Sequence, residues 1–193
     1  VFNGAWGFSD REAGEAMSKD ALYRIYSMSK PVTAVALMML YEQGHFLLSD
    51  PIARYLPELA DLRLLDGVDD AGVPLLREPA RQPTIRDLLR HTAGFSYGVF
   101  GDTPVDRAYR KADLLQQPDL ESFVATLGQQ PLLFEPGTRW HYSVAVDVQG
   151  RLVEVLSGQS FGDFLREHLF GPLGMEDTFF VVPEPERERL VQL

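Results

Sequence analysis

The stretch Tyr26-Ser27-Met28-Ser29-Lys30-Pro31, followed by Val32-Thr33-Ala34-Val35-Ala36-Leu37-Met38-Met39-Leu40-Tyr41, decides the fold. The second part is apolar except for Thr33, and Gly44 supplies a left-handed stop, so we expect a helix buried on all sides. Pro31 fits only within the first turn of a helix. Ser27 and Lys30 therefore lie at the N-terminal end of this helix, one turn apart and on one face.

This spacing has a chemical use. A serine hydroxyl is a weak nucleophile until a base takes its proton. Lys30 is close enough to act, either as a neutral amine that takes the proton or as a cation that keeps another base ionised. A capping serine beside a solvated lysine is the alternative, since S-x-x-K is a common spacing. The apolar helix favours catalysis, because a small polar patch is costly to bury without a use.

Composition narrows the classes of function. The 193 residues suffice for one domain with a core, and 28 acidic against 18 basic residues leave no basic stripe for nucleic acid. Without cysteine, and without paired-histidine spacings, we expect no metal and no cofactor. No secretory leader is seen and no apolar run is long enough to span a membrane, so the compartment, cytoplasmic or periplasmic, stays unassigned.

The other elements are an antiparallel hairpin built from residues 1–7 and 22–26, followed mainly by short helices. Cap residues and apolar spacing predict helices at 85–90, 119–127, 144–156 and 161–170. We expect a small hairpin around residues 70–72, an ordered loop beside a cleft at 94–104 and a solvated tail at 184–189.

Together, the expected strands and helices predict an α+β protein with an antiparallel sheet and a helical lobe, in one domain over residues 1–193. Residues 1–50 hold strands and the central helix. Residues 51–175 form the mainly helical lobe, and residues 176–193 are a tail or the start of a return to the sheet.

Tyr142 is the second candidate group, in a loop between the turn Pro136-Gly137 and a predicted helix. A tyrosine phenolate beside a lysine cation is able to accept the proton of Ser27, which would make Tyr142 the general base. A half-buried tyrosine with its hydroxyl in water is the alternative.

Five motifs resemble those of the serine β-lactamase-related hydrolases, which include class C β-lactamases, D-alanyl-D-alanine peptidases and family VIII carboxylesterases. They are Arg24–Val35, Thr84–Phe95, Phe134–Gly137, Tyr142-Ser143 and Phe170–Met175, in the family's order and over most of the chain. The resemblance implies a β-lactamase/transpeptidase-like fold. It also implies a serine hydrolase that forms an acyl-enzyme.

The resemblance assigns three catalytic roles. Ser27 matches the nucleophile, Lys30 the activating lysine, and Tyr142 the general base that later acts as general acid. The backbone N–H of Ser27 would be one oxyanion donor. Val144 stands where β-lactamases and peptidases have the asparagine of Y-x-N. This favours hydrolysis of small carboxylic esters over that of β-lactams or D-amino-acid peptides, which remain the alternative.

A third family motif, K-T-G, H-x-G or W-x-G on a strand, is not found after Tyr142. We therefore expect a fragment, or a site completed by a second chain or a C-terminal segment. The expected ligand is a small ester or amide. The alternative outside enzymology is a non-catalytic scaffold that keeps the fold with an incomplete site.

Gly94-Phe95-Ser96-Tyr97-Gly98 satisfies G-x-S-x-G and raises a rival, an α/β-hydrolase with Ser96, an aspartate and His141 or His168. That motif requires a strand before the serine, whereas a helix is predicted there, so Ser27 is preferred. Four aromatic residues either line an acyl pocket or pack in the core: Phe95, Tyr97, Phe100 and Trp140.

Overall fold

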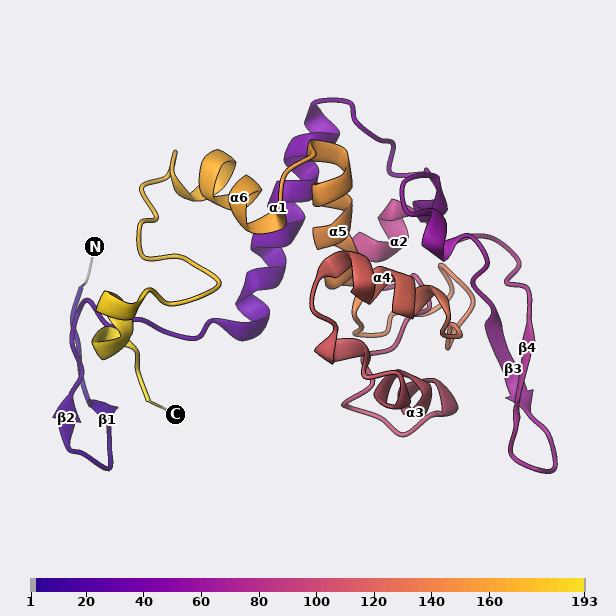
Figure 1. Ribbon diagram of the computed structural model, residues 1–193, viewed down its shortest axis with the longest axis horizontal. Coiled ribbons are helices and arrows are strands. Elements are labelled where there is room, and N and C mark those ends of the chain that lie inside the picture. Colours follow the sequence, from indigo (N-terminus) through magenta and orange to yellow (C-terminus); the bar gives the residue numbers. More distant parts are fainter. Residues whose placement is uncertain (1–2, 193) are drawn as a thin grey trace. The chain divides into compact units, whose positions relative to one another are not determined.

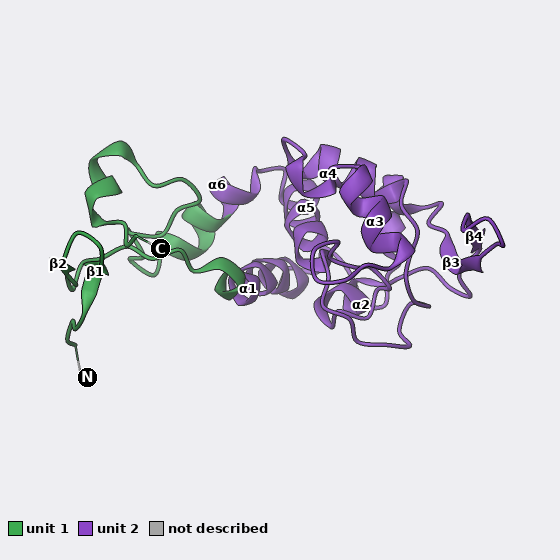
Figure 2. Ribbon diagram, turned by 90° about the horizontal axis from the view of Figure 1, so that it is seen from below, with its two compact units in different colours: residues 1–29, 165–193 green, residues 30–164 purple. Residues whose placement is uncertain are grey.

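The computed structural model describes residues 3–192. They form two compact units, coloured separately in Figure 2. Unit 1 is drawn from residues 1–29 and 165–193, and unit 2 from residues 30–164. The single-domain boundary at 1–193 stays a prediction. Over the described residues, no helix is both long and apolar enough to span a bilayer.

Unit 1 contains the predicted N-terminal hairpin at a shifted position. Its antiparallel strands are β1, Phe8–Asp10, and β2, Glu15–Ala16. The prediction that residues 1–7 and 22–26 form the strands is wrong, because residues 8–10 extend while residues 11–14 make the turn. Val1 and Phe2 belong to that prediction but lie outside the described residues.

The C-terminal segment returns to the N-terminal one within unit 1. Leu22 N–H donates to the carbonyl of Arg189 at 2.7 Å, and Val191 N–H donates to the carbonyl of Leu22 at 3.0 Å, which makes a parallel bridge at Leu190. Residues Glu184–Arg189 form a 3-10 helix. This segment is solvated as predicted, since Glu184, Pro185, Arg187 and Glu188 are exposed. It is not a loose tail, because the half-buried Arg189 donates to Asp177 at 3.0 Å.

The central helix α1 covers Ser29–Glu42, with Pro31 in its first turn and Gly44 at a φ of 80° just beyond its end, as expected. Its fully buried positions recur at helical spacing, Thr33, Ala36, Leu37 and Leu40. Val35 on the opposite side is 46% exposed. The prediction of a helix buried on all sides is therefore wrong, since the described chain buries one face, covers Ala34 and Met38 only in part and leaves Val35 exposed.

The core of unit 2 forms around α5, Ala145–Ser157. This helix packs against α2, Ile85–Leu89, and against α4, Leu120–Gly128 (Figure 1). Val148, Leu152 and Val153 of α5 are fully buried there. A buried amide, Gln149 Nε2, donates to the carbonyl of Leu88 at 3.1 Å and ties α5 to the end of α2.

Helix starts follow the caps seen in the sequence. Thr84 and Asp87 form a capping box at α2, and Asp119 accepts from Ser122 N–H at the start of α4. Gly158 ends α5 at a φ of 73°. The predicted helix at 161–170 is α6, Phe161–Leu165, continued by a π-helical turn, Arg166–Phe170. These four helix predictions are confirmed within two residues.

The remaining elements of unit 2 are two 3-10 turns, Ile52–Arg54 and Pro57–Leu59, a hairpin, and α3, Pro104–Lys111, followed by the 3-10 turn Leu114–Gln116. The small hairpin expected around residues 70–72 is confirmed as β3, Leu64–Val68, paired antiparallel with β4, Pro74–Arg77. Among the described residues the strands form two separate two-stranded sheets beside many helices, so the α+β class is confirmed.

Candidate active site

Ser27 lies in unit 1, in a 3-10 turn, Tyr26–Met28, that runs directly into α1. Met28 N–H donates to the carbonyl of Ile25 at 2.9 Å and closes this turn. Tyr26 has a φ of 44°, a left-handed conformation that is uncommon for a bulky residue. Such strain clusters at functional sites. The candidate nucleophile thus follows a strained residue and precedes Lys30 by three residues along the chain.

Unit 2 brings together Lys30 and Tyr142, which are far apart in the sequence. Lys30 comes from the first turn of α1 and Tyr142 from the loop before α5. The Nζ of Lys30 is 4.7 Å from the ring centroid of Tyr142 and 5.6 Å from that of Tyr97. The two tyrosine rings stack with centroids 5.4 Å apart and planes inclined by only 3°. An ammonium beside two phenol rings is therefore the centre of the candidate site.

Other aromatic rings frame Tyr142. The ring centroid of Phe100 is 6.2 Å from that of Tyr142, and the centroid of Trp140 is 6.5 Å from it. Both outer side chains are largely exposed, whereas Phe95 is buried. Of the four aromatic residues assigned to a pocket or to the core, Phe95 belongs to the core and the other three surround the candidate site.

His91 positions the Tyr142 loop. Its ring centroid is 5.1 Å from that of Tyr142, and its Nδ1 accepts the N–H of Ser143 at 3.3 Å. Its carbonyl accepts the N–H of His141 at 2.9 Å. Burial, and then the charge of Lys30, lower the pKa of His91. A neutral ring suits this role, because an unprotonated Nδ1 is an acceptor.

Asp147 is a site residue that the sequence analysis missed. It occupies the first turn of α5, and burial raises the pKa of its carboxyl even though the charge of Lys30 opposes this. Burial also raises the pKa of Tyr97, again against the charge of Lys30. The negative charge of Asp147 also raises the pKa of Tyr97. Its only sequence signal is an acidic residue in the first turn of the helix after Tyr142.

Ser96 is held in a structural network. Its buried Oγ donates to Asp106 Oδ1 and lies 3.3 Å from His141 Nε2. In a catalytic triad the histidine stands between the serine and the acid, whereas here the serine contacts the acid directly. Helix α2, and no strand, precedes it. His168 belongs to unit 1. This geometry argues against Ser96 as the nucleophile.

Comparison with known proteins gives one consistent picture. A protein-family model described as "Beta-lactamase" matches residues 1–193. Protein Rv1367c of Mycobacterium tuberculosis is 42% identical over 95% of this chain and 45% of its own length. Esterase EstB of Burkholderia gladioli is 37% identical over 97% of this chain and 45% of its own length.

Among solved structures, "EstCE1, a hydrolase with promiscuous acyltransferase activity" is 30% identical, with a TM-score of 0.77. The match covers 96% of this chain and 46% of that one. The chain spans about half the length of the curated relatives it matches.

Proposed function

Because this chain belongs to the Beta-lactamase family, we propose that it provides the nucleophile, the lysine and the tyrosine of a serine hydrolase that cleaves small carboxylic esters. It has the β-lactamase/transpeptidase-like fold that its motifs predicted. The proposed catalytic residues are Ser27, Lys30 and Tyr142.

One observation carries the proposal, the 4.7 Å approach of Lys30 Nζ to the ring of Tyr142. An ammonium beside the ring stabilises negative charge that develops on the phenol oxygen. The same lysine is tied by the chain to Ser27, one helical turn earlier. A nucleophile, a cation and a base are therefore available from two short segments, as an activated serine requires.

The proposed reaction runs in two halves. The Oγ of Ser27 bonds to the ester carbonyl carbon while its proton passes to the oxygen of Tyr142, and the backbone N–H of Ser27 donates to the oxyanion. The C–O bond to the alcohol then breaks, and the alcohol takes the proton from Tyr142. Water next attacks the acyl carbon, gives a proton to Tyr142 and releases the acid, and Ser27 regains that proton.

Val144 supports esters as the substrate class. Its side chain is fully buried and its N–H donates to the carbonyl of Ser96 at 3.1 Å. No side-chain hydrogen bond is therefore available from this position to a substrate amide. The second oxyanion donor, which the resemblance assigns to a K-T-G-like strand, stays a prediction for a further segment or a second chain.

Steady-state hydrolysis of p-nitrophenyl acetate by the purified protein tests the proposal. Ser27→Ala is expected to lower kcat/KM at least about 10³-fold, since a lost nucleophile is not replaced. Ser96→Ala is expected to form the acyl-enzyme still. Turnover retained in Ser27→Ala, or lost only in Ser96→Ala, contradicts the assignment.

The role of Tyr142 has a matched control. Tyr142→Phe is expected to lower kcat by about 10²–10⁴-fold, the range for loss of a general acid–base group. Tyr23→Phe removes a phenol hydroxyl from an exposed residue of unit 1, and is expected to leave kcat unchanged. Equal kcat values for the two variants would remove Tyr142 from the mechanism, and inactivity of the unaltered protein would favour the non-catalytic scaffold.

A further inference from the structure

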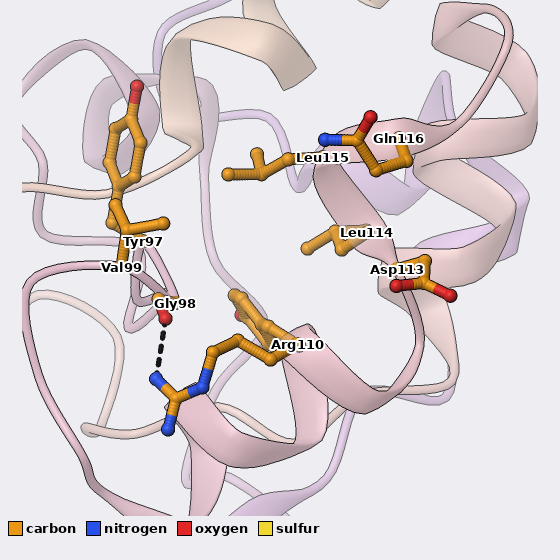
Figure 3. A pocket seen from close by; sticks show the side chains of 9 residues that line it. Tyr97, Gly98, Val99, Arg110, Asp113, Leu114, Leu115 and Gln116 are labelled. Atoms are coloured by element: carbon orange, nitrogen blue, oxygen red, sulfur yellow. Dashed lines mark hydrogen bonds between the residues drawn. The ribbon is translucent and has the colours of Figure 1, made fainter.

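A cavity of about 260 Å³ lies in unit 2 beside the candidate site. Figure 3 shows Tyr97 and Val99 on one side of it, with Leu114, Leu115 and Gln116 facing them across the gap. The first side comes from the loop after α2 and the second from the 3-10 turn Leu114–Gln116 after α3. The helix that the sequence analysis overlooked, α3, therefore supports one wall of a pocket.

The lining of this pocket, to be called the side pocket, is mainly apolar. Val99, Leu114 and Leu115 supply aliphatic groups, and Tyr97 supplies an aromatic ring. The one basic residue, Arg110, uses its guanidinium to donate to the carbonyls of Gly98 at 2.7 Å and Gly101 at 3.0 Å. It also pairs with Asp102. The charge of Arg110 therefore holds the wall together. Asp113 is the acidic residue of the lining, but most of the lining is aliphatic or aromatic, which suits an uncharged, apolar group.

Besides Arg110, the side pocket is lined by the polar residues Asp113 and Gln116. Gln116 lines the side pocket, and within residues 3–192 its side-chain amide makes no hydrogen bond. An amide offers both donors and an acceptor. A mainly apolar lining with a small number of polar groups is the usual make-up of a small-molecule site.

Tyr97 connects the side pocket to the candidate catalytic groups. Its ring lines the pocket, stacks on Tyr142 with centroids 5.4 Å apart, and has the Nζ of Lys30 at 5.6 Å from its centroid. When the carbonyl of a substrate reacts beside Tyr142, the side pocket is therefore close to it, at a distance of about the width of the Tyr97 ring. Size limits what enters, since an apolar cavity of about 150 Å³ binds benzene. Pockets for drug-sized ligands begin at roughly 300 Å³.

We propose that the side pocket binds the apolar group of the ester substrate, a group about as large as an aryl ring or a short branched chain, and that Leu115 sets its size limit. This inference rests on the proposed ester hydrolysis. Leu115 is chosen because its side chain is 43% exposed and points across the gap toward Tyr97 in Figure 3. This apolar group belongs to either the acyl part or the alcohol part of the ester, and the pocket would bind both in the same way.

Two series of esters distinguish those sources. The acyl series compares p-nitrophenyl benzoate with p-nitrophenyl acetate, and the alcohol series compares benzyl acetate with methyl acetate. In each series we compare the kcat/KM of the bulky ester with that of the small one. Leu115→Trp fills the side pocket and is expected to lower this ratio at least about tenfold in one series, since about tenfold is the discrimination that a small change of pocket size produces. Leu115→Ala is expected to raise the same ratio.

The matched control is Leu75→Trp, the same substitution at a leucine that is 50% exposed on the β4 strand. It is expected to leave both ratios unchanged. Ratios that do not move in Leu115→Trp in either series, or that move equally in Leu75→Trp, overturn the inference.

A binding measurement separates this inference from the proposed function. The probe is 4-phenylbutan-2-one, which matches benzyl acetate in shape but has no ester bond, and butan-2-one is its small control. The phenyl ketone is expected to shift the methyl NMR signals of Val99, Leu114 and Leu115, and Leu115→Trp is expected to abolish the shifts. Shifts without any ester turnover would defeat the proposed function alone. Absence of both shifts and ratio changes would defeat the side pocket alone.

Discussion

Asp106 links the two walls of the side pocket, so its replacement is the sharpest test of the local structure. The buried carboxylate accepts hydrogen bonds from Ser96 Oγ and from Gly98 N–H at 3.3 Å, both in the loop that carries Tyr97. It also accepts from Thr103 N–H at 2.9 Å and Thr103 Oγ1 at 2.7 Å, at the start of α3. Asp106→Ala removes all four contacts.

The magnitude follows from the donors that lose their acceptor. A buried donor left unsatisfied costs about 1–3 kcal/mol, and Ser96 Oγ and Gly98 N–H are such groups. Ser96 is able to turn toward His141 Nε2, 3.3 Å away, which offsets part of the cost. The weakened cap of α3 adds about 1 kcal/mol. We expect a total loss of about 3–4 kcal/mol of unfolding free energy.

Urea denaturation, followed by tryptophan fluorescence, measures this loss. The chain has 2 tryptophans, Trp6 and Trp140, so a Trp6→Phe background leaves Trp140 to report on unit 2. With an m-value of about 2 kcal/mol/M, Asp106→Ala is expected to lower the midpoint by about 1.5–2 M. Asp102→Ala, which removes an exposed carboxylate from the same loop, is expected to cost less than about 1 kcal/mol. A loss for Asp106→Ala no larger than that for Asp102→Ala would refute the reasoning.

Two further predictions concern the stability of unit 2. Burial by itself would raise the pKa of Asp87, but hydrogen bonds from Arg81 and Thr84 lower this pKa below the ordinary 3.8. The contribution of the Asp87 carboxylate to stability is therefore complete above pH 3.8 and is lost as the pH falls below that value. Asp87→Asn is therefore expected to flatten the fall in unfolding free energy between pH 6 and pH 3, and an unchanged slope in urea titrations would contradict this. Gly128→Ala is expected to destabilise the protein by about 1–3 kcal/mol, because the added Cβ would lie 2.1 Å from the carbonyl oxygen of Glu58. A neutral or stabilising result in urea denaturation would contradict this packing.

Local sequence signals were enough for most helices of unit 2. Thr84 and Asp119 cap their helices by contacts within three residues, so their side chains alone mark α2 and α4. Helix α3 carried a similar signal, a Thr103–Asp106 capping box with Pro104 in the first turn. It was missed because its apolar pattern is short: the buried apolar residues of this helix are Val105 and Tyr109, and most of their neighbours are charged.

The candidate site was predictable only in part. The Ser27–Lys30 spacing is local, and Tyr142 was a candidate from its loop position and the chemistry of its phenol before the family resemblance assigned its role. Asp147 and His91 owe their roles to burial and to contacts between distant segments, which no single stretch of sequence specifies. The exposure of Val35 was missed for the same reason, since an apolar helix does not reveal how many of its faces the rest of the chain covers.

Covalent labelling with a fluorophosphonate tests the central claim most directly. Ser27 is expected to carry the label when the protein is digested and its peptides are analysed by mass spectrometry, and labelling is expected to slow at least about 10²-fold in Tyr142→Phe, since the base is lost. A label on Ser96, or no label on protein that still hydrolyses p-nitrophenyl acetate, would contradict the assignment of Ser27, Lys30 and Tyr142.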